Sequence, residues 1–250
     1  MIALKSQLLY ILPVAAFLFL TALCRYAWEG HTTVSSASFK EEYILVDAGH
    51  GGEDGGAQGY DGTLEKNINL TVASDLSALL RMLGYTVSTS RDSDVSLATE
   101  GNSVRARKVS DMQNRLAMYN EACFTVSIHQ NYFHQSKYSG TQLFCANDPQ
   151  SKALGECIRN AVVGILQPNN HRANKVASGD IFLLHNSKRP AVIVECGFLT
   201  NKQECDHLKT DEYQKQVLNP HLCEPPFYLH PEQVRFLFLI HNFSSQVLLV

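Results

Sequence analysis

The chain has 250 residues, of which 45% are hydrophobic and 18% are charged, and its formal net charge is −3. This composition is typical of a folded protein with one domain and additional segments, and it excludes a largely disordered chain. The small negative charge also argues against nucleic acid as a partner, because phosphates require clustered positive charge.

The first predicted element is an apolar segment near the N-terminus. Residues 8–23 are almost wholly apolar, and no charge occurs between Lys5 and Arg25. A stretch of this length can cross a bilayer as one helix, and Tyr26 and Trp28 follow where an aromatic belt would lie. We therefore predict a membrane anchor in residues 1–30, with a cleaved signal peptide as the alternative. Either one predicts export of the remaining chain, and the polar residues 31–41 are predicted to be a linker.

Residues 42–121 alternate between strand and helix patterns. An apolar run over residues 44–46 ends in Asp47 and is followed by a glycine-rich turn, which is typical of a buried strand leaving a sheet. Apolar residues then recur at helical spacing over residues 65–83. Residues 85–90 are predicted to be a strand, residues 93–103 a polar loop and residues 108–121 a second helix.

Residues 124–195 also alternate between strand and helix patterns. We predict strands over residues 124–129, 140–146, 181–184 and 191–195, and a helix that ends at residue 165 before Pro168. Strands that alternate with helices indicate an α/β layered domain. The seven cysteines include no C-x-x-C pair, and the apolar surroundings of Cys123, Cys145 and Cys196 favour buried thiols over a disulfide framework.

Ionisable side chains occur where three of the predicted strands end. His50, His129 and Glu195 follow apolar runs, and Glu65 begins the first helix after a glycine loop that is long enough to fold back. If the strands are parallel neighbours, these side chains converge at one edge of the sheet. Two histidines and two glutamates suit zinc, with three ligands and one carboxylate as a base. In the alternative interpretation, the histidines bind backbone groups and Glu65 only complements the helix dipole.

Four motifs then indicate a family. They are VDAGHGG at residues 46–52, EKNINL at 65–70, SIHQN at 127–131 and PAVIVECGFLTN at 190–201. In this order and spacing, over residues 42–217, they closely resemble zinc-dependent N-acetylmuramoyl-L-alanine amidases. The resemblance implies a twisted, mostly parallel sheet of about six strands flanked by helices. It also implies zinc ligation by His50, Glu65 and His129, with Glu195 as the general base.

The resemblance further implies a reaction. A zinc-dependent amidase of this kind hydrolyses the amide bond between N-acetylmuramic acid and the L-alanine of peptidoglycan stem peptides. Glu195 would accept a proton from the attacking water and pass it to the departing amine. Two alternatives stay open: a zinc hydrolase of another amide or peptide, and a non-catalytic peptidoglycan-binding module. A binding module would be expected to have an incomplete set of metal ligands.

Further residues resemble one branch of the family, the single-domain, membrane-anchored amidases of spore cortex peptidoglycan. These are NRL at 114–116, YSGTQ at 138–142, and the pair Arg172 and Lys175. We expect substrate contacts from Asn131, Arg115, Arg172 and Lys175, although the last two also fit a solvated basic loop. The expected location is the outer face of the cytoplasmic membrane, the cell wall or the forespore intermembrane space. The identity of any protein activator stays open.

The predicted domain ends abruptly. Residues 211–217 are predicted to begin a closing amphipathic helix, which Pro220 interrupts, and Pro225, Pro226 and Pro231 follow. Proline inside a helix costs about 3 kcal/mol, so the helix cannot continue. We therefore interpret residues 218–250 as an atypical tail produced by a shifted reading frame, and a genuine divergent ending is the alternative.

Overall fold

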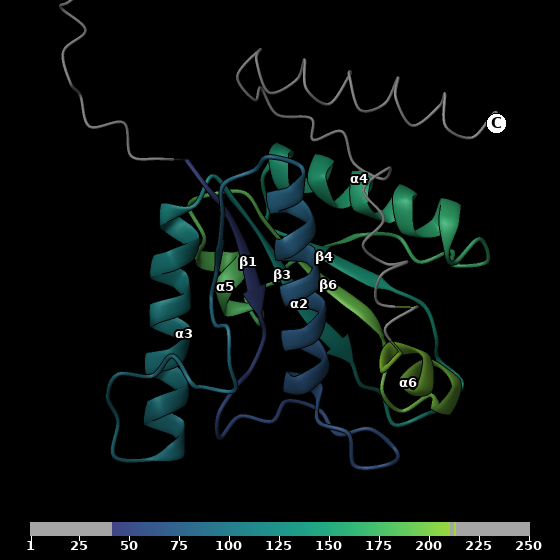
Figure 1. Ribbon diagram of the computed structural model, residues 1–250, viewed down its shortest axis with the longest axis horizontal. Coiled ribbons are helices and arrows are strands. Elements are labelled where there is room, and N and C mark those ends of the chain that lie inside the picture. Colours follow the sequence, from purple (N-terminus) through teal and green to yellow (C-terminus); the bar gives the residue numbers. More distant parts are fainter. Residues whose placement is uncertain (1–41, 211–212, 214–250) are drawn as a thin grey trace, which may run out of the picture. The chain divides into compact units, whose positions relative to one another are not determined.

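The computed structural model describes residues 42–210 and 213, and Figure 1 shows a central sheet with helices packed around it. The sheet has six strands in the order β2-β1-β3-β6-β4-β5. The strands are β1 (Ile44–Ala48), β2 (Val87–Thr89), β3 (Phe124–Asn131), β4 (Gln142–Cys145), β5 (Lys175–Val176) and β6 (Ala191–Phe198). β4 pairs with β6 in antiparallel fashion, and the other pairings are parallel. The predicted α/β fold with a mostly parallel sheet is confirmed.

Five helices surround the sheet within the described chain. They are α2 (Glu65–Met82), α3 (Val104–Glu121), α4 (Pro149–Ile165), α5 (Phe182–Asn186) and α6 (Lys202–Leu208). Three of them have an N-cap residue whose side chain accepts a hydrogen bond from a backbone amide of the first turn. These residues are Ser103 for α3, Asp148 for α4 and Asn201 for α6. The cap at Ser103 explains why α3 begins at Val104 and not at the predicted residue 108.

Both faces of the sheet are buried, which explains the nearly continuous apolar runs of β1 and β6. Neighbouring residues of a strand point to opposite faces. Val46 and Val194 thus pack in one apolar cluster that includes residues of α2, α4 and α6. Leu45 and Ile193 pack in a second cluster, with residues of α3 and α5. The central strands β1, β3 and β6 are therefore fixed from both sides.

One predicted strand is wrong. Residues 181–184 were expected in the sheet, but Phe182–Asn186 forms the short helix α5, and the edge strand is instead β5. Leu183 and Leu184 are buried, whereas Phe182 is 40% exposed. Four apolar residues in a row fit a strand and a helix equally well, so periodicity could not separate the two. The two residues of β5 are too few to produce a pattern.

The predicted thiols are partly confirmed. Cys145 and Cys196 are buried free thiols, as is Cys205, whereas Cys123 is partly exposed. Burial raises the pKa of the Cys196 thiol to about 12, so this group stays protonated at neutral pH.

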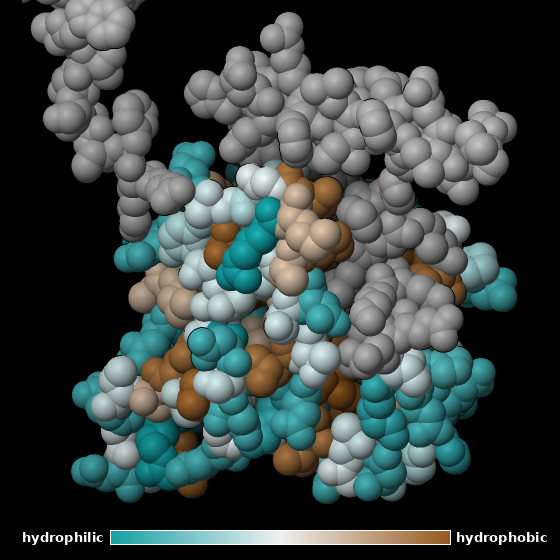
Figure 2. Space-filling view, viewed as in Figure 1, coloured by the Kyte–Doolittle hydropathy of each residue, from teal (hydrophilic) through white to brown (hydrophobic). Residues whose placement is uncertain are grey.

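Several predictions concern residues outside the described part of the chain. They are the anchor or signal (1–30), the linker (31–41), the atypical tail (218–250) and most of the closing helix (211–217). Of that helix only Tyr213 is described, and its hydroxyl accepts a hydrogen bond from Gln167 Nε2 at 2.9 Å. In the described chain, no helix combines the length and the apolar character that a membrane crossing requires. Figure 2 shows hydrophilic and hydrophobic residues interspersed on one face of this part.

Candidate metal centre at the carboxyl edge of the sheet

Three adjacent strands bring ionisable side chains to one edge of the sheet. β1 and β3 are parallel neighbours with Ala48 beside Ile128, and β3 and β6 are parallel neighbours with His129 beside Glu195. His50 follows the end of β1. The structure therefore gathers the ends of these strands in the way that the parallel arrangement predicts.

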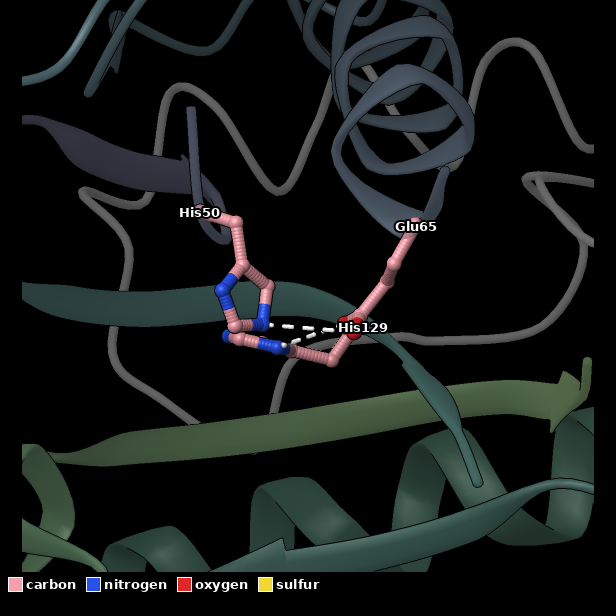
Figure 3. A group of neighbouring side chains, drawn as sticks. All are labelled: His50, Glu65 and His129. Carbon is pink, nitrogen blue, oxygen red and sulfur yellow. Dashed lines mark hydrogen bonds and ion pairs between the residues drawn. The ribbon is translucent and has the colours of Figure 1, made fainter. Parts of the chain in front are cut away.

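His50, Glu65 and His129 form a compact cluster at this edge (Figure 3). His50 Nε2 lies 3.3 Å from Glu65 Oε2, and His129 Nδ1 lies 3.0 Å from Glu65 Oε1. The two imidazole rings meet edge to face, with 5.0 Å between their centroids. One ligand atom from each residue lies within 4.8 Å of the other two. Three donors at this spacing can hold one metal ion.

The backbone and a carboxylate orient His50. Its φ of 61° lies in the left-handed region, which residues other than glycine rarely adopt. Its Nδ1 lies 3.0 Å from Asp54 Oδ2, which leaves Nε2 facing Glu65. Burial alone would lower the pKa of His50, but hydrogen bonds to Asp54 and Glu65 raise it to about 9. The two carboxylates therefore favour a positive charge on this imidazole.

Two glycines make room for the cluster. A Cβ atom on Gly49 would lie 2.2 Å from His129 Nε2. Gly56 has a φ of +67°, and a Cβ atom there would lie 2.5 Å from Glu65 Oε2. Both contacts are far inside van der Waals distance, so the glycines allow the backbone to approach these side chains.

The carboxylate of Glu65 is surrounded by donors. Oε2 accepts a hydrogen bond from Ala57 N at 2.8 Å, and Oε1 accepts from Gln130 N at 3.0 Å and from Asn69 Nδ2 at 3.2 Å. Burial alone would raise the pKa of Glu65, but its contacts with His129 and His50 hold that pKa well below its usual range. The group is therefore charged at neutral pH, as a metal ligand must be.

Glu195 has the opposite surroundings. Its Oε2 atom is buried and has no hydrogen-bond partner in the described part of the chain. Burial raises the pKa of Glu195 to about 7, against the opposing effect of His129. A carboxyl group with such a pKa can accept and release a proton near neutral pH.

Arg115 differs from its expected role in substrate binding. Its side chain is 2% exposed. It forms an ion pair with the buried Asp47, donates to Asp111 Oδ2 at 2.7 Å and donates to the His50 carbonyl at 2.7 Å. A side chain buried in this way has no surface to offer a substrate, so Arg115 supports the turn that carries His50.

The other expected substrate contacts lie at different places. Asn131 ends β3, and its carbonyl accepts a hydrogen bond from Leu199 N at 2.9 Å. Arg172 lies over the ring of Phe198, 4.8 Å from the centroid, and donates to the Ser139 carbonyl at 3.0 Å. Lys175 is exposed on the edge strand β5, which two strands separate from β3. Asn131 and Phe198 end neighbouring strands, whereas Lys175 lies on the far edge.

Sequence reasoning missed three residues that contact the cluster or its turns: Asp54, Asn69 and Arg91. A signal existed for two of them. Asp54 lies four residues after His50, within the same glycine loop, and Asn69 lies four residues after Glu65, on the same side of α2. Arg91 offers no such signal, because its contacts are distant in sequence.

Comparisons with known proteins agree with this arrangement. A family model described as N-acetylmuramoyl-L-alanine amidase matches residues 44–221. The germination-specific N-acetylmuramoyl-L-alanine amidase of Bacillus subtilis (strain 168) is 30% identical over 219 residues, which cover 85% of this chain and 91% of that protein.

Solved structures show the same similarity. The CwlD amidase from Clostridioides difficile, in complex with the GerS lipoprotein, is 38% identical with a TM-score of 0.68, and the match covers 71% of this chain and 92% of that one. An N-acetylmuramoyl-L-alanine amidase from Clostridium difficile 630 is 26% identical with a TM-score of 0.61, over 71% of this chain and 91% of that one.

Proposed function

We propose a metal site and residue roles on the premise that this chain belongs to the N-acetylmuramoyl-L-alanine amidase family. The chain is accordingly a hydrolase that cleaves the amide bond between N-acetylmuramic acid and the L-alanine of peptidoglycan stem peptides. The observation that carries the proposal is the cluster of His50, Glu65 and His129 at the edge of the sheet.

Zinc fits this donor set. Catalytic zinc sites use three protein ligands of the imidazole and carboxylate type and leave one position open. Two imidazole nitrogens and one charged carboxylate, all within 4.8 Å of one another, supply such a set. When bound, zinc would polarise the substrate carbonyl and lower the pKa of water to about 7. His50, Glu65 and His129 are the proposed ligands.

Glu195 is the proposed general base and acid. It lies beside His129 across the β3–β6 pairing, and its buried carboxyl group has a pKa of about 7. In the charged form, Glu195 accepts the proton of the attacking water. In the protonated form, it gives this proton to the departing amine of L-alanine, without which the amide bond does not break. Among the described residues, no donor holds its Oε2 atom in the charged state, which supports a role in moving a proton.

The proposed substrate is spore peptidoglycan. A relative similar over 85% of this chain is named a germination-specific amidase, and one similar solved structure is a complex with a lipoprotein. We infer an exported enzyme with its catalytic domain in residues 42–217, held by residues 1–30, that acts in the cell wall or the forespore intermembrane space. A lipoprotein is the kind of protein partner that these comparisons favour.

The test is digestion of purified peptidoglycan with mass spectrometry of the products. We expect free stem peptides that begin with L-alanine and glycan strands that retain the lactyl group. Spore cortex and vegetative peptidoglycan, digested in parallel, test the substrate preference. Cleavage between two amino acids of the stem would instead show a peptidase, and binding without products would show a non-catalytic module.

A further inference from the structure

The turn that carries His50 lies between two buried arginines from distant parts of the chain. Arg115, on α3, donates to the Ala48 carbonyl at 2.9 Å and to the His50 carbonyl at 2.7 Å. Arg91, which follows β2, donates from Nε to the Ala48 carbonyl at 3.0 Å and from Nη2 to the Gly49 carbonyl at 3.1 Å. Three consecutive carbonyl groups are thus bound from outside the turn.

These contacts explain the backbone conformation of His50. A φ of 61° is unfavourable for a residue with a Cβ atom, and it persists where the surrounding contacts determine it. Hydrogen bonds to the carbonyls of Ala48, Gly49 and His50 supply such contacts.

Arg91 also connects this turn to α2. Its Nη2 atom donates to the Gly49 carbonyl at 3.1 Å and to the Lys66 carbonyl at 2.8 Å. Gly49 precedes His50, and Lys66 follows Glu65. One guanidinium nitrogen therefore joins the two segments that carry these ligands.

Asn69 makes a second connection between the same segments. Its Nδ2 atom donates to the Gly49 carbonyl at 3.1 Å and to Glu65 Oε1 at 3.2 Å. Gln130 Nε2 donates to Asn69 Oδ1 at 3.1 Å, which fixes the orientation of the Asn69 amide. The Gly49 carbonyl thus accepts hydrogen bonds from both Arg91 and Asn69.

The partners of Arg91 are unusual for a buried cation. Arg91 is 4% exposed, and its hydrogen bonds go to the backbone carbonyls of Ala48, Gly49, Lys66 and Ser93. Arg115, by contrast, binds the carboxylates of Asp47 and Asp111. A buried charge without a bonded counter-charge is costly. The planar fork of a guanidinium binds several carbonyls in a fixed geometry, which the single ammonium group of lysine cannot do. This geometry is a reason for an arginine to be buried here in spite of the cost.

We propose that Arg91 and Asn69 are positioning residues that hold the Gly49 carbonyl and thereby set the spacing between His50 and Glu65. This inference rests on the proposed metal site. Arg91 acts only through the turn and the start of α2, and Asn69 also orients the Glu65 carboxylate directly. Loss of either residue should loosen the donor set while the rest of the fold stays intact.

The test compares two variants with two matched controls in the full chain. Arg91→Lys keeps the charge but loses the fork. Its control is Arg81→Lys, because exposed Arg81, in the last turn of α2, also donates to a carbonyl, that of Val87, at 3.1 Å. Asn69→Ala removes the second donor, and its control is Asn67→Ala, an exposed residue on the same helix.

The readouts are zinc affinity and folding of the metal-free proteins. Zinc ion is titrated into each protein in competition with a chromophoric chelator, and circular dichroism follows thermal unfolding. We expect Arg91→Lys and Asn69→Ala to bind about one zinc per chain with an affinity lowered roughly 10–100-fold. Both controls should match the wild type. At saturating zinc, kcat on peptidoglycan should fall while KM changes little, because neither side chain is expected to contact substrate.

The possible outcomes separate this inference from the proposed function. If the wild type binds zinc and both variants bind it as tightly as their controls, the inference is overturned. It is also overturned if the variants lose folded protein while the remaining folded sites keep the wild-type affinity. If Arg91→Lys does not fold, Asn69→Ala decides. If the wild type itself binds no zinc, the proposed metal site fails, and this inference fails with it.

Discussion

The start of α2 and the strand β6 each place a glutamate, Glu65 and Glu195, at the same edge of the sheet, but the two carboxyl groups have opposite surroundings. Glu65 accepts hydrogen bonds from two backbone amides and from Asn69, and its contacts with His129 and His50 lower its pKa. Glu195 has one oxygen without a partner in the described chain, and its pKa is raised to about 7. Burial by itself raises both pKa values, and the direct contacts of Glu65 with His129 and His50, which have no hydrogen-bonded counterpart at Glu195 among the described residues, decide which carboxyl group keeps its charge.

Asp47 extends this comparison. It is fully buried in β1, and it forms an ion pair with Arg115. Its Oδ2 atom also accepts hydrogen bonds at 2.7 Å from Tyr119 and Ser127. Burial alone would raise the pKa of Asp47, but Arg115 and these donors hold it well below its usual range. Asp47 thus resembles Glu65 in its charge, although its role is to stabilise the fold.

The largest expected effect follows from removal of the metal. A chelator should abolish the amidase activity, and added zinc should restore it, because the charged Glu65 and the two imidazoles are arranged to hold a cation. Activity on peptidoglycan and metal content by elemental analysis are measured together. Full activity in a preparation without transition metal would show that Glu65 is not a ligand.

The next effect concerns stability. Asp47→Asn should lower the free energy of unfolding by about 3–5 kcal/mol, because it removes one partner of a buried ion pair. Urea denaturation measures the change. The control is Asp61→Asn, since Asp61 is exposed and its ion pair with Lys209 is solvated, and its effect should be much smaller and should decline with added salt. Equal losses in the two variants would contradict the importance of burial.

The smallest effects are opposite pH dependences in the metal-free protein. The folded-state pKa of Asp47 is lowered, so its stabilising contribution is present above about pH 4 and is lost as the pH falls towards the folded-state value. The folded-state pKa of Glu195 is raised to about 7, so the wild type should gain stability relative to Glu195→Gln as the pH falls from about 8 to about 4.5. Unfolding at several pH values measures both differences. Slopes of the same sign would refute the contrast between these carboxyl groups.

The sequence predicted the strands that form this edge because they are buried on both faces and carry continuous apolar residues. The chain between residues 191 and 194, at the start of β6, is such a case. The sequence could not predict α5, because four apolar residues contain no usable period. It also could not predict β5, whose two exposed residues reflect only their pairing with β4.

The residues of the site also divide into those that the sequence predicted and those that it could not predict. His50, His129 and Glu195, which lie near the carboxyl ends of their strands, were predictable from position. The burial of Arg115 was not, because the acceptors of its guanidinium at Ala48 and His50 lie more than sixty positions away in sequence. Arg91 likewise binds backbone carbonyl groups. Every residue has such a group, so the sequence does not indicate which of them a side chain binds. Long-range contacts with the backbone are therefore the part of the site that required the structure.

One measurement tests the division of roles between the two glutamates most directly: zinc content and activity of Glu195→Gln and Glu65→Gln, prepared side by side. We predict that Glu195→Gln retains about one zinc per chain and loses activity by roughly 10²–10⁴-fold, the contribution of a general base. Glu65→Gln, like His129→Ala, should lose both zinc and activity. Loss of zinc from Glu195→Gln as readily as from Glu65→Gln would make Glu195 a ligand and would contradict the account.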